Sequence, residues 1–276
     1  MLKHFLLVVL FVFGVSAQAK TLKFLFVGNS LTYSPGDSSN PELPRQFSLI
    51  AENLGLDVSV DFIVKGGQTL RKHFETGQVA EKLRDNKYDY VVIQGYSIEA
   101  LFLPVCFYNM GGPLGRPDFL KYTSELTQMI KDNGAIPVLF GTWTYQAMHP
   151  WLQEGFLCLR FSENESNAGE KWYGNDLYDF QRMLDEGYRQ AGDANPDLKV
   201  KYLGKKWQQM MDDPKGVITD TKLYLPDHIH PAIHGTFFNA LFFVHDLLEA
   251  DLSSLKYKPT TLTSEEFEYF KNYLNR

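Results

Sequence analysis

The chain has 276 residues, of which 44% are hydrophobic and 22% charged, so it is long enough for one large globular domain and is not disordered in bulk. Its formal net charge of −6 excludes the broad basic surface typical of nucleic-acid-binding proteins. Residues 1–19 combine a short basic start, an apolar run and an Ala-Gln-Ala cleavage pattern, which predicts a signal peptide followed by a single domain over 20–276. We therefore expect a secreted or periplasmic protein with no integral membrane span after signal removal.

Five short apolar runs predict the strands of a parallel sheet. Each run is nearly continuous in apolar residues rather than alternating, which is typical of strands covered on both faces. Each run also ends at a glycine or is followed by a glycine, either directly or after one polar residue. The runs cover residues 22–28, 58–64, 88–93, 136–140 and 199–203.

Helical patterns lie between these runs. Apolar residues recur at helical spacing within 43–54, 70–83, 119–130, 177–191 and 237–248. We expect Gly192 to end the fourth helix, and a capping box over 263–266 to begin a last one. Because strand and helix alternate, the sequence predicts an α/β fold: a flavodoxin-like three-layer sandwich whose five-stranded parallel sheet has helices on both faces.

One long segment, residues 142–175, lacks regular periodicity and is rich in aromatic residues. Two interpretations are open: the rings form the small core of an inserted loop, or they wall a substrate pocket. Trp143 and Tyr145 are the better pocket candidates, because they follow a strand end, where open α/β sheets bind their ligands.

The cysteine and glycosylation patterns do not decide between the possible folds or functions. Cys106 and Cys158 could form a disulfide in an oxidising compartment or remain two buried thiols, and both interpretations are open. Asn164 begins an Asn-Glu-Ser acceptor pattern, which matters only in a eukaryotic host.

A serine follows the first predicted strand directly, in Gly28-Asn29-Ser30. A serine in a tight turn at a strand end can project its hydroxyl from the sheet and leave nearby backbone N–H groups free to bind an oxyanion. The same serine could instead cap a helix.

An Asp and a His stand three residues apart before the last long helix, at Asp227 and His230. In a turn, this spacing can place the carboxylate against the imidazole, so that the other ring nitrogen accepts a serine proton. His228, His230 and His234 also suggest a metal cluster, but Pro231 indicates a turn and no further ligand has a natural place. We therefore expect no metal, and we expect His228 either to line the pocket or to support the residues that do.

Together these two blocks resemble those of the SGNH hydrolases, also called GDSL-type esterases and lipases. That family has Gly-Asp-Ser or Gly-Asn-Ser after the first strand and Asp-x-x-His before the last main helix, as here at 28–30 and 227–230. The resemblance implies that Ser30 is the nucleophile, His230 the base and Asp227 the residue that orients it, without a cofactor. It also implies an oxyanion hole formed by the N–H groups of Ser30 and of Gly67, the glycine after the second strand.

The third block departs from the family pattern. The family usually shows Gly-x-Asn-Asp after the third strand, and that Asn side chain is an oxyanion donor. Here the strand ends in Gln94, which carries the same amide one methylene further out, so the resemblance assigns this donor to Gln94. We also expect Asn29 in the substrate pocket, and Lys65 and His73 on the surface.

The resemblance implies a serine hydrolase that acts on ester bonds through an acyl-enzyme. The expected substrate is a small-molecule or glycan ester, with deacetylation of carbohydrate as the favoured activity and no nucleic-acid partner. Two alternatives are open: an acyltransferase that uses the same three residues, and a catalytically silent glycan-binding module on the same fold.

Overall fold

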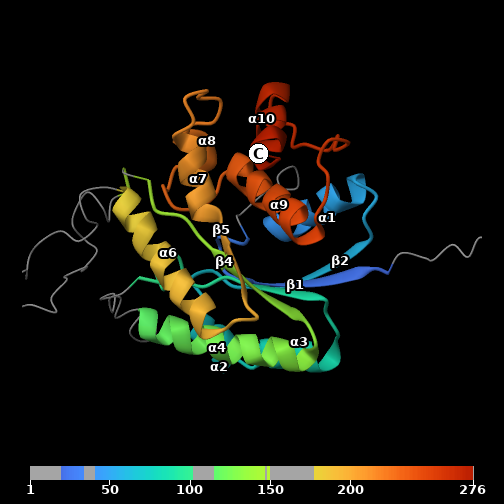
Figure 1. The fold of residues 1–276 in the computed structure, drawn as a ribbon, viewed down its shortest axis with the longest axis vertical. Coiled ribbons are helices and arrows are strands. Elements are labelled where there is room, and N and C mark those ends of the chain that lie inside the picture. Colours follow the sequence, from blue (N-terminus) through green and yellow to red (C-terminus); the bar gives the residue numbers. More distant parts are fainter. Residues whose placement is uncertain (1–19, 34–40, 102–114, 147, 150–176, 276) are drawn as a thin grey trace, which may run out of the picture.

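The structure is a computed structural model that describes residues 20–33, 41–101, 115–146, 148–149 and 177–275 (Figure 1). The predicted signal peptide, both cysteines, Asn164 and most of the aromatic segment therefore lie outside the described residues. None of the helices in the described ranges combines the length and apolar character that a membrane span requires.

Five strands form one parallel sheet in the order β2-β1-β3-β4-β5. The central strands β1, β3 and β4 are almost wholly buried, whereas the edge strands β2 and β5 carry exposed residues such as Phe62 and Lys199. The predicted five-stranded α/β fold is confirmed. The strand bounds are β1 Leu22–Gly28, β2 Val58–Val64, β3 Tyr90–Ile93, β4 Ile136–Gly141 and β5 Lys199–Tyr202.

Helices cover both faces of the sheet, and Figure 1 shows one layer above the strands and one below. The upper layer contains α1 (Leu43–Asn53), α7 (Leu203–Met211), α8 (Asp220–Leu223), α9 (Ile233–Leu248) and α10 (Ser264–Leu274). The lower layer contains α2 (Leu70–Glu75), α3 (Gln78–Asp85), α4 (Arg116–Asn133) and α6 (Leu177–Ala194).

Successive residues of β1 pack into different layers, because side chains alternate across a strand. Phe24 and Phe26 contact the upper layer, and Leu25 and Val27 the lower one. A strand buried on both sides in this way has no need of polar residues, which explains the continuous apolar run in the sequence.

Three glycines mark places where the elements differ from the sequence predictions. The helix predicted over 70–83 is two helices, because Gly77 adopts a left-handed backbone conformation (φ 71°) that separates α2 from α3. Helix α6 continues past Gly192 to Ala194. The fifth strand ends at Tyr202 and α7 begins at the next residue, so Gly204 lies inside a helix rather than at a strand end.

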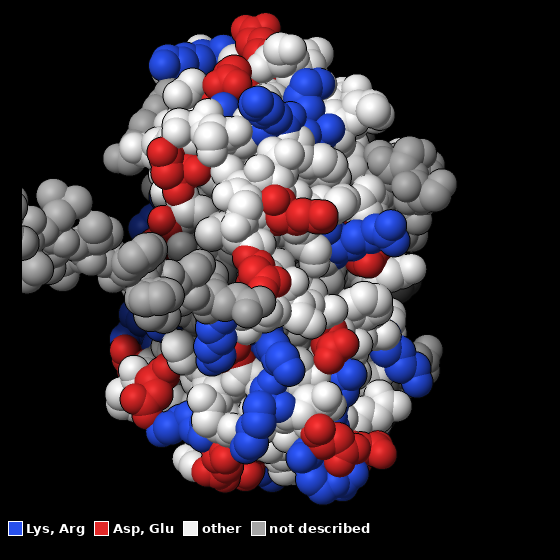
Figure 2. Space-filling model, turned by 90° about the vertical axis from the view of Figure 1, so that its right-hand side faces the viewer, with Lys and Arg blue, Asp and Glu red and all other residues white. Residues whose placement is uncertain are grey.

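The surface mixes charges of both signs. On the face drawn in Figure 2, the Lys and Arg side chains of the described residues are interspersed with Asp and Glu side chains, and they form no broad basic patch there.

The carboxyl ends of the central strands bring distant segments together. Gly28 at the end of β1 pairs with Val64 of β2, and Val27 pairs with Ile93 of β3. The residues that follow these three strands therefore meet at one edge of the sheet, where parallel α/β folds bind their ligands.

Candidate active site

Ser30 sits in a tight turn that begins where β1 ends, and Asn29 organises this turn. The Asn29 side-chain oxygen accepts a hydrogen bond from the Leu31 N–H at 3.1 Å. Its side-chain nitrogen donates to the Gln68 carbonyl at 2.9 Å and to the Gly95 carbonyl at 3.1 Å. Asn29 thus connects the nucleophile turn to the segments that follow β2 and β3, and its side chain is almost fully buried.

The structure brings together the three residues predicted for catalysis. His230 Nε2 lies 2.6 Å from Ser30 Oγ, and His230 Nδ1 lies 2.6 Å from an Asp227 carboxylate oxygen. Asp227 and His230 belong to the turn between α8 and α9, and α1 and α9 pack side by side in the upper layer. The contact between Ser30 and His230 spans 200 residues of sequence.

Asp227 is held as a carboxylate by hydrogen bonds. Partial burial raises its pKa, but the backbone N–H groups of His230 and Ile229 and the His230 ring lower the pKa by more, so that the net direction is below the ordinary Asp value. An ionised carboxylate accepts, so it selects the tautomer in which Nδ1 of His230 carries the proton. Nε2 then faces the Ser30 hydroxyl with a free lone pair.

Trp143 supports the Asp-His turn from inside the core. Its indole N–H donates to the Ile229 carbonyl at 3.0 Å, and its ring stacks on Trp207 with a centroid separation of 4.0 Å. Only 2% of Trp143 is exposed. The structure therefore places it beneath the turn and away from the position expected for a pocket wall.

His228 anchors the same turn to the segment after β4. Its Nδ1 lies 2.7 Å from Gln146 Oε1, and the Gln146 N–H donates to the His228 carbonyl at 2.9 Å. His228 has φ 66°, a left-handed conformation that costs a non-glycine residue about 1 kcal/mol. These two contacts explain why the turn keeps that conformation. They also direct the ring toward Gln146, and His228 is not among the residues that line the cavity, so of its two expected roles the contacts favour support of the turn.

A cavity of about 250 Å³ opens beside Ser30 and His230. Gly67 lines it from the turn after β2, and Tyr96 and Ser97 line it from the segment after β3. The Ser97 hydroxyl lies 2.8 Å from the Tyr145 hydroxyl, and Tyr145 is 1% exposed. Tyr145 therefore reaches the candidate site through Ser97 and not as an exposed pocket ring.

Gln94 lies behind the nucleophile turn. Its side-chain oxygen accepts hydrogen bonds from the Asn29 N–H and the Thr32 hydroxyl, both at 3.0 Å, and its side-chain nitrogen donates to the Gly95 carbonyl. The residue is fully buried and is not among those lining the cavity. This placement changes the role expected for Gln94 from oxyanion donor to support of the turn.

Ser97 occupies the place that Gln94 was expected to fill. Counted from Gly95, it stands at the Asn position of the family's Gly-x-Asn block, and it lines the cavity. That register was visible in the sequence, but the prediction chose Gln94 because Gln carries the same amide group as the family's Asn.

His73 corrects another expectation, since it is 1% exposed and not a surface charge. Burial lowers its pKa to about 4, against the effect of its hydrogen bond to the Gly28 carbonyl. The neutral ring donates from Nε2 to that carbonyl at 2.9 Å and so fixes α2 to the end of β1. Lys65 is exposed, as expected.

The three histidines near the Asp-His turn face different partners. His230 contacts Ser30 and Asp227, His228 contacts Gln146, and His234 lies 3.3 Å from Glu266. In the part of the chain that the structure describes, no group of three or more His, Cys, Asp or Glu residues is arranged to hold a metal ion.

No family model matches the sequence, and no curated protein matches it. Solved structures do resemble the fold. A DUF4886 family protein from Bacteroides uniformis is 14% identical, with a TM-score of 0.64 over 92% of this chain and 93% of that one. A protein from Slackia heliotrinireducens proposed to be an SGNH hydrolase is 20% identical, with a TM-score of 0.56 over 80% and 96%.

An acetylxylan esterase from Geobacillus stearothermophilus, solved as a catalytic mutant, is 13% identical, with a TM-score of 0.52 over 86% of this chain and 97% of that one. At these identities the likeness establishes the fold. The resemblance to SGNH hydrolases inferred from the motif blocks is thereby confirmed at the level of the fold.

Proposed function

We propose that this chain, which has the fold of the SGNH hydrolases, is a serine esterase that hydrolyses carboxylic esters through an acyl-enzyme. The observation that carries the proposal is the pair of 2.6 Å contacts that runs from Asp227 through His230 to Ser30 beside a cavity. A carboxylate, an oriented imidazole and a serine hydroxyl are the groups that nucleophilic acyl transfer requires.

The reaction proceeds in two halves. His230 Nε2 accepts the Ser30 proton as Oγ attacks the ester carbonyl carbon, and Asp227 stabilises the imidazolium that forms. His230 then donates this proton to the leaving alcohol oxygen, and the acyl group stays on Ser30. Water attacks the acyl-enzyme with His230 again as base, which releases the acid and restores the hydroxyl. No cofactor takes part in these steps.

The oxyanion is held by the backbone N–H groups of Ser30 and Gly67, with the Ser97 hydroxyl as the third donor. Ser97 replaces Gln94 in this role because the Gln94 amide is engaged within the turn. If Tyr145 donates to Ser97 Oγ across their 2.8 Å contact, the Ser97 proton remains available for the substrate oxygen. Three converging donors stabilise the charge that develops in the transition state.

A short acyl group suits the cavity, whose volume of about 250 Å³ is below the ~300 Å³ at which typical ligand pockets begin. An acetyl ester would place its acyl part there and leave the alcohol part outside. The acetylxylan esterase among the neighbours supports acetylated carbohydrate as the substrate class. The leader pattern in residues 1–19 supports export to a compartment that contains such polymers.

Labelling with a fluorophosphonate probe, read by intact mass, tests the nucleophile. We expect one adduct on the wild-type protein and none on Ser30→Ala, because only a serine activated by His230 attacks the phosphorus at neutral pH. Ser59→Ala, which removes an exposed hydroxyl on β2, is the matched control and should label like the wild type.

A folded wild-type protein without an adduct would contradict the esterase proposal and favour the silent glycan-binding module. An adduct on Ser30→Ala would show that another residue is the nucleophile. Once labelling is established, product analysis with and without a carbohydrate acceptor distinguishes hydrolysis from acyl transfer.

A further inference from the structure

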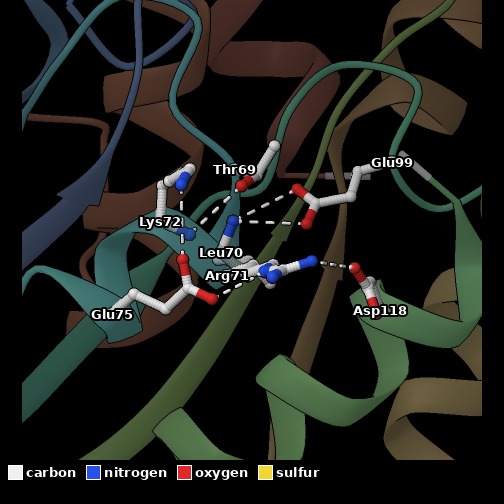
Figure 3. Close-up of polar contacts among 7 residues, drawn as sticks. All are labelled: Thr69, Leu70, Arg71, Lys72, Glu75, Glu99 and Asp118. Carbon is white, nitrogen blue, oxygen red and sulfur yellow. Dashed lines mark hydrogen bonds and ion pairs between the residues drawn. The ribbon is translucent and has the colours of Figure 1, made fainter. Parts of the chain in front are cut away.

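Glu99 is a buried carboxylate beside the candidate site that the proposed reaction does not use. It lies in the segment that follows β3 and is 1% exposed. Figure 3 shows its side chain directed toward the first residues of α2. A charge removed from water to this extent requires specific partners.

Two backbone N–H groups supply those partners. The Leu70 N–H lies 3.3 and 3.2 Å from the two carboxylate oxygens, and the Tyr96 N–H donates to one of them at 2.7 Å. Leu70 begins α2 three residues after Gly67, and Tyr96 immediately precedes Ser97. One carboxylate therefore binds both of the segments that carry the proposed oxyanion donors.

We propose that Glu99 is a positioning residue whose ionised carboxylate holds the Gly67 turn and the Tyr96–Ser97 segment in the arrangement that serves Ser30, so that protonation of Glu99 slows the reaction there. This inference rests on the proposed esterase function. The physical reason is the nature of the partners, which are both N–H donors. A protonated carboxyl group gives up acceptor capacity and gains a proton for which these donors offer no acceptor.

Among the residues that the structure describes, the charged and titratable groups around Glu99 include no cation paired with it. Tyr96 belongs to its own segment, Asp118 faces it from α4 and Tyr188 from α6. Figure 3 draws two cations of α2, and both have other partners. Arg71 pairs with Glu75 at 2.7 Å and with Asp118 at 3.3 Å, and Lys72 lies 3.4 Å from Glu75.

These surroundings set the range in which Glu99 titrates. Burial raises the pKa of Glu99 to about 7, and Asp118 adds to the effect, while the two N–H bonds oppose it. The carboxylate is therefore ionised above neutral pH and becomes protonated as the pH falls through about 7. Acidification through this range then removes the ionised Glu99 that the reaction requires.

The test compares the rate of Ser30 labelling by the fluorophosphonate probe across the neutral pH range in three proteins. We expect the wild-type rate to fall as the pH decreases through about 7. Glu99→Gln should label at least about tenfold more slowly at alkaline pH, because misplaced groups lose rate steeply. It should also lose the part of this decrease that comes from protonation of Glu99.

Glu75→Gln is the matched control, because it makes the same chemical change at an exposed residue of α2 that pairs only with Arg71 and Lys72 among the contacts drawn in Figure 3. It should keep the wild-type rate and profile. A Glu99→Gln protein with the wild-type rate and the wild-type acid limb would overturn the positioning role.

A second measurement uses the wild-type protein alone and needs no activity. In protein labelled with ¹⁵N at Leu and Tyr, the amide signals of Leu70 and Tyr96 should shift with one midpoint at about pH 7. Amides that do not move through this range would overturn the role of Glu99 even in an active esterase. A protein whose amides titrate but whose Ser30 never labels would instead overturn the proposed function.

Discussion

The amide side chains of Asn29 and Gln94 use their polar atoms to hold the nucleophile turn, although Asn29 lines the cavity, as expected, and Gln94 does not. Both nitrogens donate to backbone carbonyls, and both oxygens accept from the turn itself. A buried amide left without hydrogen bonds destabilises the fold, so these two side chains keep their hydrogen-bond partners. At the residue scale, this leaves the Ser97 hydroxyl as the side-chain donor best placed to meet a developing oxyanion.

Ser97→Ala is expected to lower kcat about 100-fold with little change in KM, because an oxyanion donor acts mainly in the transition state. Steady-state hydrolysis of p-nitrophenyl acetate measures both constants. Ser97→Thr keeps the hydroxyl and should retain most of the activity, and Tyr145→Phe should lose less than Ser97→Ala. If Ser97→Ala stays within twofold of the wild type, the oxyanion is held by the backbone donors without Ser97.

At the scale of the elements, α7 follows β5 without a connecting loop and packs closely on the segment after β4. A Cβ atom added at Gly204 would lie 2.2 Å from the Thr142 carbonyl oxygen and 2.3 Å from the Gln181 side-chain nitrogen. The carbonyl belongs to backbone and cannot turn away as a flexible side chain would. The close approach of α7 therefore requires glycine at this position.

Gly204→Ala is expected to destabilise the protein by about 1–3 kcal/mol, the usual cost of forcing an extra group into a packed interior. Urea unfolding followed by circular dichroism measures this change. Gly66→Ala is the control, since a Cβ there would meet nothing within 4 Å. Equal stability of the two variants would mean that α7 moves freely away from the segment after β4.

At the scale of the whole molecule, the sheet separates two apolar cores, and the lower core also encloses titratable groups. His73 belongs to α2 and Glu99 accepts from the Leu70 N–H at the start of that helix, and both contact segments next to Ser30. Burial disfavours the charged form of each side chain, so it lowers the pKa of His73 and raises the pKa of Glu99. The stability of the fold should therefore respond to pH through this layer.

His73→Gln isolates one part of that response. The folded pKa of His73 is about 4, below its ordinary value of 6.5, so the unfolded chain binds more protons between these values and acid destabilises the fold. From about pH 7.5 to about pH 5, the wild-type protein should lose about 2 kcal/mol of unfolding free energy that His73→Gln keeps.

Urea unfolding at both pH values measures this difference. Glu99→Gln should instead lack a gain in stability that the wild-type protein has on acidification, because the raised pKa of the Glu99 carboxyl makes acid stabilising between about 4.5 and about 7. Parallel stability losses in the wild type and His73→Gln would contradict the burial of a neutral His73.

The sequence by itself determined the parallel α/β architecture, the approximate strands and the residues that meet at Ser30, because these depend on local patterns: continuous apolar runs, a serine at a strand end, and Asp and His three residues apart. The capping box at Thr263 formed as predicted for the same reason.

The tertiary structure alone decided which polar groups face the cavity. Gln94 and Ser97 are three residues apart, and the contacts of Gln94 with the nucleophile turn and of Ser97 with Tyr145 settle which one is enclosed. The burial of Trp143, His73 and Glu99 likewise follows from contacts between segments far apart in the chain, which no local pattern encodes.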